Sequence, residues 1–199
     1  EPIDPVPFLK PAHSPNPSDA VVVPYADTPL DEEPVGENVY INLINHADEY
    51  VYLTTPYLII SDEMQRALTL AARRGVDVRI VTPGIPDKKM VFRVTRSHYA
   101  RLAAHGVRIF EFTPGFVHAK QAVADGKAAV VGTINLDYRS LYLHFENACW
   151  FSGCDAVGDV KSDFEDLFTQ SREVTGQYRV RTVAVRGLDC LLRLFSPLM

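Results

Sequence analysis

The stretch 116–135 constrains the fold of this chain more than any other part of the sequence. Apolar and polar residues alternate through its first half, which predicts a β-strand with His118 and Lys120 on one face. The dipeptide Asp125-Gly126 follows, and it is typical of two-residue turns that require positive φ at both positions. The apolar run 128–131 then predicts a buried return strand. The chain is therefore expected to build a sheet around this hairpin.

The register of the hairpin decides which polar side chains meet. With a two-residue loop, His118 is expected opposite Thr133, because the positions then count back equally from the turn. Opposed residues point to the same side of a sheet, and Lys120 and Asn135 share that side in the same register. One face of the hairpin is thus predicted to gather an imidazole, an ammonium group, a hydroxyl and a carboxamide.

This set of side chains suits a phosphate. Lys120 supplies positive charge, while Thr133 and Asn135 supply neutral donors for oxygens that gain charge in the transition state. His118 can act as a nucleophile or a proton donor near neutral pH. Glu146, on a following strand-like run, is expected to accept a bond from the second ring nitrogen of His118 and to orient it. A core hairpin with a satisfied histidine is the alternative, which five polar groups in one register disfavour.

The order of these residues along the chain is as informative as the face they share. His118 and Lys120 are followed by Asp125, then by Gly132-Thr133-x-Asn135, then by Glu146. This order resembles the HKD motif of the phospholipase D superfamily. The longer string GTINLDYRSLYLHFE is more specific, and it is similar to the second HKD half of bacterial cardiolipin synthases. The likeness covers roughly residues 21 to 199.

The resemblance implies a reaction in which two phosphatidylglycerols become cardiolipin and glycerol. One histidine attacks the phosphodiester to give a phosphohistidine, and a second histidine protonates the leaving alcohol. In the family the second half usually supplies the acid and base, so His118 is expected in that role. The resemblance also makes the Asp of the motif, here Asp125, structural, and it implies no cofactor.

One departure from the family is plain. Its enzymes carry two HKD motifs and an N-terminal pair of membrane helices, whereas this sequence shows one motif and none of those helices. The partner histidine is therefore expected from a first HKD half of the same protein or from a homodimer partner. The resemblance implies phosphatidylglycerol, an anionic phospholipid, as the substrate, and hence a membrane surface at the cytoplasmic face of a bacterial cell membrane.

Two other functions fit the same residues. The first is a phospholipase D-type hydrolase, in which water replaces the acceptor alcohol, and only product analysis separates it from a transferase. The second is a non-catalytic fragment that binds lipid or phosphate without turnover, because the partner histidine is absent from the sequence.

Composition narrows the class of protein. Of the 199 residues 47% are hydrophobic and 23% are charged, as in ordinary globular domains. No apolar run reaches the roughly 18–20 residues that cross a bilayer. The net charge of −5 weighs against nucleic acid as a partner. The three cysteines form no CxxC pair and no His/Cys cluster has zinc spacing, so no metal is expected.

Residues 1–35 differ from the rest, because they are rich in proline and acidic side chains. They are expected to form a linker or extended arm, in which only 20–24 is apolar enough for a short strand. A phospholipase D-like domain is expected over residues 36–199. Tyr57 follows a predicted strand, and ligands of α/β sheets lie beyond such strand ends, so Tyr57 is expected to line the same crevice as His118.

Helices and strands alternate after residue 36, which predicts the α/β class: a mixed, mostly parallel sheet with helices on both faces, an α-β-α sandwich. The basic, apolar stretch 183–195 is expected either to dock on the core as a helix or to lie in an anionic membrane interface. Helices are expected over 37–47, 61–74, 87–104 and 155–175, and strands over 50–55, 76–82 and 107–112.

Overall fold

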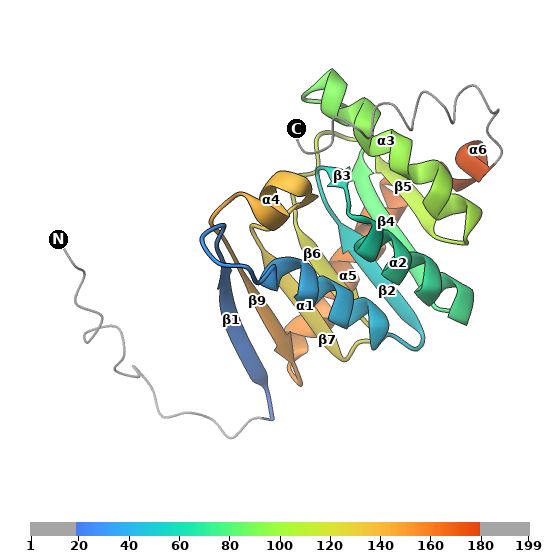
Figure 1. Cartoon of the computed structure of the whole chain (residues 1–199). Coiled ribbons are helices and arrows are strands. Elements are labelled where there is room, and N and C mark those ends of the chain that lie inside the picture. Colours follow the sequence, from blue (N-terminus) through green and yellow to red (C-terminus); the bar gives the residue numbers. More distant parts are fainter. Residues whose placement is uncertain (1–18, 180–199) are drawn as a thin grey trace.

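The computed structural model describes residues 19–179, which form a large sheet covered by helices on both faces (Figure 1). The strands are β1 (Val21–Asp27), β2 (Tyr50–Thr54), β3 (Leu58–Ile59), β4 (Asp77–Pro83), β5 (Arg108–Phe112), β6 (Gln121–Ala124), β7 (Ala128–Gly132), β8 (Leu136–Asp137), β9 (Glu146–Ser152) and β10 (Ser171–Glu173). The helices are α1 (Val35–Asn45), α2 (Asp62–Arg74), α3 (Lys89–Ala104), α4 (Tyr138–Tyr142), α5 (Asp155–Thr169) and α6 (Thr175–Arg179).

Eight strands make the large sheet, in the order β1-β9-β7-β6-β2-β4-β5-β10, and β3 pairs with β8 in a small parallel sheet. Helices α1, α2 and α3 cover one face, and α5 covers the other (Figure 1). The expected α/β class, a mixed sheet between helices, is confirmed.

The sheet is less parallel than expected. Only β2 with β4 and β4 with β5 pair in parallel within the large sheet. All its other neighbouring strands are antiparallel. Parallel neighbours need a crossover connection, and only α2 and α3 provide one between adjacent strands. The hairpin and β9 return through turns and short segments, so their half of the sheet is antiparallel.

The N-terminal boundary also differs from the expectation. Strand β1 pairs with β9 along its whole length, from Val21 opposite Ser152 to Asp27 opposite Glu146. The predicted arm of residues 1–35 therefore includes an edge strand of the sheet, longer than the short strand expected at 20–24. Residues 1–18 and the stretch 183–195 lie outside the described residues.

The predicted helix over 155–175 ends early, at Thr169. The chain then adds β10 to the sheet edge beside β5, and two ion pairs accompany this pairing. Arg108 binds Glu173 at 2.8 Å, and Arg172 lies 3.3 Å from Glu111. Residues 171–173 thus pair with an open sheet edge instead of continuing the helix. This is a tertiary effect, which the helical periodicity of the sequence cannot predict.

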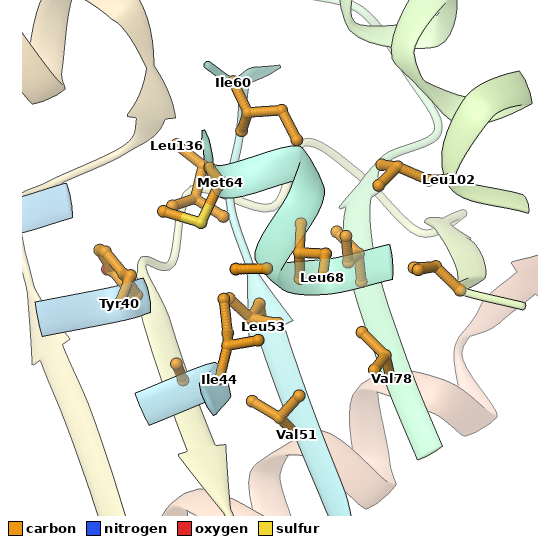
Figure 2. Close-up of a cluster of buried hydrophobic side chains, with 14 of the residues drawn as sticks. Tyr40, Ile44, Val51, Leu53, Ile60, Met64, Leu68, Val78, Leu102 and Leu136 are labelled. Atoms are coloured by element: carbon orange, nitrogen blue, oxygen red, sulfur yellow. The ribbon is translucent and has the colours of Figure 1, made fainter. Parts of the chain in front are cut away.

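Two apolar clusters sandwich the sheet. The larger lies under α1, α2 and α3, and Figure 2 shows Ile44 of α1 beside Leu53 of β2, with Met64 of α2 in the same cluster. The smaller lies between the sheet and α5 around Phe164. The hairpin contributes to both clusters, because neighbouring residues of β6 face opposite sides. The hairpin is therefore a rigid base for whatever lies at its open end.

Candidate functional site

The hairpin turn is one residue longer than predicted. Asp125 and Gly126 both have positive φ, at 54° and 64°, as expected for this dipeptide. The Lys127 N–H donates to the Ala124 carbonyl at 2.9 Å. Strand pairing resumes only with Ala128 opposite Ala124, which leaves Lys127 as an extra residue in the turn.

The longer turn changes the register by one residue. Gln121, not Lys120, lies opposite Val131, and the Gly132 N–H donates to the Lys120 carbonyl at 3.1 Å. Regular pairing in β6 begins at Gln121, so His118 and Lys120 lie in the irregular segment before the strand. The predicted cross-strand pairing of His118 with Thr133 is therefore wrong.

Asp125 holds the turn in place. Its carboxylate accepts the backbone N–H groups of Asp48, Glu49 and Tyr50 at 2.8, 2.9 and 2.8 Å. Burial acts to raise the pKa of Asp125, but these three bonds and Lys127 outweigh it and hold that pKa below its ordinary value. The side chain thus joins the hairpin to the loop before β2, which agrees with a structural role.

The predicted site residues nevertheless meet in one place. A cavity of about 570 Å³ at the open end of the hairpin is lined by five of the six predicted residues. They are His118, Lys120, Thr133, Asn135 and Glu146, and Ala119, Gln121, Val131 and Gly132 complete the wall. The site forms because the segment before β6 and the segment after β7 leave the sheet at the same edge.

Buried neighbours position the two segments. Asn135 lies between Ile134 and Leu136, both buried in the larger cluster, and the Leu136 N–H donates to Thr55 Oγ1 at 3.0 Å. Val117, next to His118, is buried in the smaller cluster. The functional side chains thus alternate with anchored apolar ones, which fixes their direction without regular strand pairing.

Lys120 folds over His118. Its Nζ lies 2.8 Å from Nδ1 and 3.2 Å from Nε2 of the ring, and it donates to the His118 carbonyl oxygen at 2.7 Å. Burial first, and the Lys120 charge second, lower the pKa of His118, against a weaker opposing effect of Asp87. Burial also lowers the pKa of Lys120, which Glu146 and Asp137 partly offset. Both effects on His118 favour the neutral form of the unliganded imidazole.

Glu146 has a different partner from the one predicted. Its carboxylate accepts the hydroxyl hydrogen of Thr133, and Nδ1 of His144 lies 3.6 Å from its other oxygen. The predicted bond from Glu146 to His118 is not formed, because the Lys120 ammonium group lies at the ring nitrogens of His118. Glu146 reaches His118 only through the charge of Lys120, whose pKa it raises.

Asn135 is also partly engaged. Its Nδ2 donates to Ser140 Oγ at 3.0 Å, while its Oδ1 is buried and has no hydrogen-bond partner among residues 19–179. One amide hydrogen is thus used to hold α4. The Asn135 side chain also acts on Asp137, where its hydrogen bond helps to lower the pKa of that carboxyl against the effect of burial.

Tyr57 lines a neighbouring cavity rather than the cavity of His118. This second cavity, of about 270 Å³, shares Asn135 with the first. The Tyr57 hydroxyl donates to Asp87 at 2.5 Å. Its ring lies 6.2 Å from that of Phe116, which in turn lies 5.9 Å from the His118 ring. Tyr57 therefore belongs to the site region, one cavity away from its expected place.

Several residues after Asn135 that line the second cavity were not predicted from the sequence. Arg139, Ser140 and His144 all lie in the string NLDYRSLYLH, which was noted only for its family likeness. The useful signal was Asp137 three residues before Ser140, a typical helix N-cap spacing. Asp137 indeed accepts the Ser140 N–H at 3.0 Å and starts α4.

Comparison with known proteins decides the family. Residues 40–168 match the family model described as "Cardiolipin synthase, PLD-like domain". The chain belongs to this family. A cardiolipin synthase of Halalkalibacterium halodurans is 34% identical over 193 residues, which are 96% of this chain and 38% of that protein. An uncharacterized protein of Streptococcus mutans is 51% identical over 179 residues, 89% of this chain and 39% of its own length.

The chain thus spans about two fifths of the length of these curated relatives. Solved structures agree on the fold. The phospholipase D family member Nuc of Salmonella typhimurium has a TM-score of 0.66 at 18% identity, covering 78% of this chain and 98% of Nuc. Phosphatidylserine synthase of Haemophilus influenzae has a TM-score of 0.69 at 15% identity, covering 92% of this chain and 46% of that enzyme.

Residues 19–179 contain neither a membrane-spanning helix nor a metal-binding cluster. No helix in this range combines the length and apolar character needed to cross a bilayer. No group of three or more His, Cys, Asp and Glu side chains in the same range is arranged to hold a metal ion.

Proposed function

We propose that this chain is one half of a cardiolipin synthase-type phosphatidyltransferase, which joins two phosphatidylglycerols into cardiolipin and releases glycerol. The observation that carries the proposal is the single cavity in which His118, Lys120, Thr133, Asn135 and Glu146 meet, in a chain of the cardiolipin synthase domain family. An imidazole, one cation and two neutral donors around a cavity are the groups that in-line phosphoryl transfer uses.

The first chemical step forms a phosphohistidine. A ring nitrogen of a partner histidine attacks the phosphorus of the donor lipid, and the phosphorus–oxygen bond to the glycerol headgroup breaks. His118, in its protonated form, gives its proton to that glycerol oxygen, so free glycerol leaves. Lys120 and Asn135 hold the phosphate oxygens while negative charge grows on them, and the Thr133 hydroxyl joins them by turning its hydrogen from Glu146 to the phosphate.

The second step reverses these roles. Neutral His118 takes the proton from a primary hydroxyl of a second phosphatidylglycerol, and that oxygen attacks the phosphorus. The phosphorus–nitrogen bond breaks, which releases cardiolipin and regenerates the partner histidine. No cofactor takes part, because every proton and electron pair is exchanged between the two lipids and the two imidazoles.

Substrate binding raises the pKa of His118, so that the ring takes from solvent the proton that the first step requires. In the unliganded site the Lys120 ammonium faces both ring nitrogens of His118 and helps to keep the ring neutral. A bound phosphodiester attracts that ammonium and adds its own negative charge beside the ring. Both changes raise the pKa of His118, so the acid is formed when a lipid is present.

The site needs a second half, because attack and departure occur on opposite sides of one phosphorus and this cavity offers one histidine. Exposed apolar side chains near the cavity agree with a missing cover: Phe145 is 71% exposed, Leu143 50% and Val131 39%. Tyr57 and its neighbour Phe116 are half-buried, so they contribute less to this exposed surface. The cover is either a first HKD half or, through two-fold symmetry, a second copy.

The test is transfer on vesicles of phosphatidylglycerol, with monomer and dimer separated by size before the assay. Cardiolipin should form only from a paired species, and His118→Ala should remove it. His46→Ala is the matched control, because His46 lies at the end of α1, away from the cavity.

Other products discriminate between the functions. Phosphatidic acid without cardiolipin would establish the hydrolase, and vesicle binding without any product from a paired species would establish a lipid-binding fragment. Cardiolipin formation by a verified monomer would overturn the half-site. We place the working protein at the membrane surface, where its substrate is, with no nucleic acid involved.

A further inference from the structure

The second cavity, lined by Tyr57 and Arg139, is positioned to bind part of a ligand. It adjoins the cavity of His118, and Asn135 lines both. Its walls come from the segment after β2, from the start of α3 and from α4. The elements β3 and α4 lie at the same end of the large sheet (Figure 1). A ligand bound to Asn135 in the first cavity therefore has a direct continuation into the second.

The wall of this second cavity carries cations that the described protein does not neutralise. Lys88, just before α3, and Arg139 of α4 both line it and are exposed. Neither side chain forms an ion pair with any residue between 19 and 179. His144 lines the same wall and faces Glu146 at 3.6 Å. Two unpaired cations around a small cavity indicate an anionic ligand.

One acidic side chain, Asp137, lines the same cavity. It is buried, and its carboxylate accepts the Ser140 N–H at 3.0 Å at the start of α4. Asp87 is engaged as well, by the Tyr57 hydroxyl at 2.5 Å and the Lys88 N–H. The remaining polar atom is Oδ1 of Asn135, a buried acceptor without a donor in the described protein, which fits a ligand that brings a hydroxyl.

We propose that the second cavity binds the phosphoglycerol headgroup of the acceptor lipid, with Arg139 and Lys88 on its phosphate. The assignment rests on the proposed function, because the product has two phosphates joined through one glycerol. With one phosphate at His118 and Lys120, the bridging glycerol runs past Asn135. The second phosphate then lies in the adjoining cavity.

Two water-soluble probes separate the cavities. Glycerophosphoglycerol carries one phosphate, and bis(glycerophospho)glycerol, the cardiolipin headgroup without acyl chains, carries two. Calorimetry with the full 199-residue chain should show the two-phosphate probe binding about tenfold more tightly, the gain from one charge-assisted contact of ordinary strength. Arg139→Gln should remove this preference and leave the affinity for the one-phosphate probe unchanged.

The controls test charge and folding separately. Arg93→Gln removes an exposed arginine of α3 that lines neither cavity, so the preference should persist in it. Lys88→Gln lies outside any helix or strand and should reduce the preference even if Arg139→Gln fails to fold. Equal affinity for the two probes in the unmodified chain, or equal weakening of both by Arg139→Gln, would overturn the proposal.

The outcome does not depend on turnover. If no paired species makes cardiolipin but the Arg139-dependent preference is present, the second cavity binds a phosphate and the proposed transferase, with its acceptor role for this cavity, fails. If cardiolipin is made and Arg139→Gln has no effect on the preference, the transferase stands and the subsite fails.

Discussion

The turn that carries Asp125 offers a sharp test of how this site is held together. The side chain is 2% exposed, and its carboxylate accepts three backbone N–H groups at 2.8–2.9 Å. The residue also has a φ of 54°, in the left-handed region that costs most residues free energy. Substitution by glycine or by alanine removes the hydrogen bonds of the carboxylate in both cases. The two variants differ in the cost of the positive φ, which glycine tolerates and alanine does not.

The magnitudes follow from the exposure of the donors. A hydrogen bond to a charged group contributes roughly 1.5–3 kcal/mol, and a buried donor left without a partner costs a similar amount. The donors at Asp48 and Glu49 are exposed and can turn to water, whereas the Tyr50 N–H is half-buried. Asp125→Gly should therefore lower the free energy of unfolding by about 2–3 kcal/mol. Asp125→Ala should cost about 1 kcal/mol more, because alanine resists a positive φ.

The pH dependence has a definite sign. The folded-state pKa of Asp125 lies below its ordinary value, so its contribution is present above the unfolded pKa of about 3.9 and is lost as the pH falls through the folded-state pKa. The difference in unfolding free energy between the unmodified chain and Asp125→Asn should thus be constant from neutral pH down to about pH 5 and shrink below about pH 4.

Urea unfolding, followed by circular dichroism at several pH values, measures all of these differences. Equal destabilisation by Gly and Ala would refute the argument from φ. A difference from Asp125→Asn that stays unchanged at low pH would refute the argument from the charged carboxylate.

Three further predictions concern other residues. Gly132→Ala should destabilise the fold by about 1–3 kcal/mol, because the new Cβ would lie 2.4 Å from the Cβ of Ala148. Gly115→Ala is the control, because open space surrounds Gly115, and thermal unfolding measures both variants. Arg96→Ala should lower the free energy of unfolding, measured in urea, by about 2–3 kcal/mol. The buried Glu111 carboxylate loses two hydrogen bonds of 2.8 Å, and Arg172 remains as its partner and limits the loss. Lys120→Met should raise the pKa of His118 part of the way to its ordinary value, measured by NMR titration; an unchanged pKa would mean that burial alone lowers it.

Local signals predicted the framework well. Helix α2 shows why, since Ser61 caps its start by accepting the Met64 N–H at 3.0 Å, and Gly75 ends it with a φ of 100°. Both are short-range effects, so the sequence contains them. The small parallel pair of β3 and β8 has no such signal, because it depends on two segments that meet only after the sheet has formed.

Long-range competition explains what the sequence could not show. Thr133 donates to Glu146 and also accepts the Asn147 N–H at 3.0 Å, so β9 takes up the hydroxyl that was expected to face only a substrate. The extra turn residue, Lys127, is likewise explained by contacts with a distant part of the chain. The three donors that hold Asp125 come from the end of the loop before β2 and from the first residue of β2, and nothing in the hairpin sequence indicates that these donors will be there.

The five residues from His118 to Glu146 nevertheless line one cavity although the predicted register was wrong, and the reason is physical. A slip of one residue exchanges the faces of all side chains along a paired strand, so within regular pairing it would have separated His118 from Thr133. Pairing stops at Gln121 on one strand and at Val131 on the other, and the functional residues come before and after it. Beyond those points the buried Val117, Ile134 and Leu136 set the direction of their neighbours. A site formed by the segments that precede and follow paired strands thus tolerates a change of register. A site formed by side chains on one face of a paired strand would not.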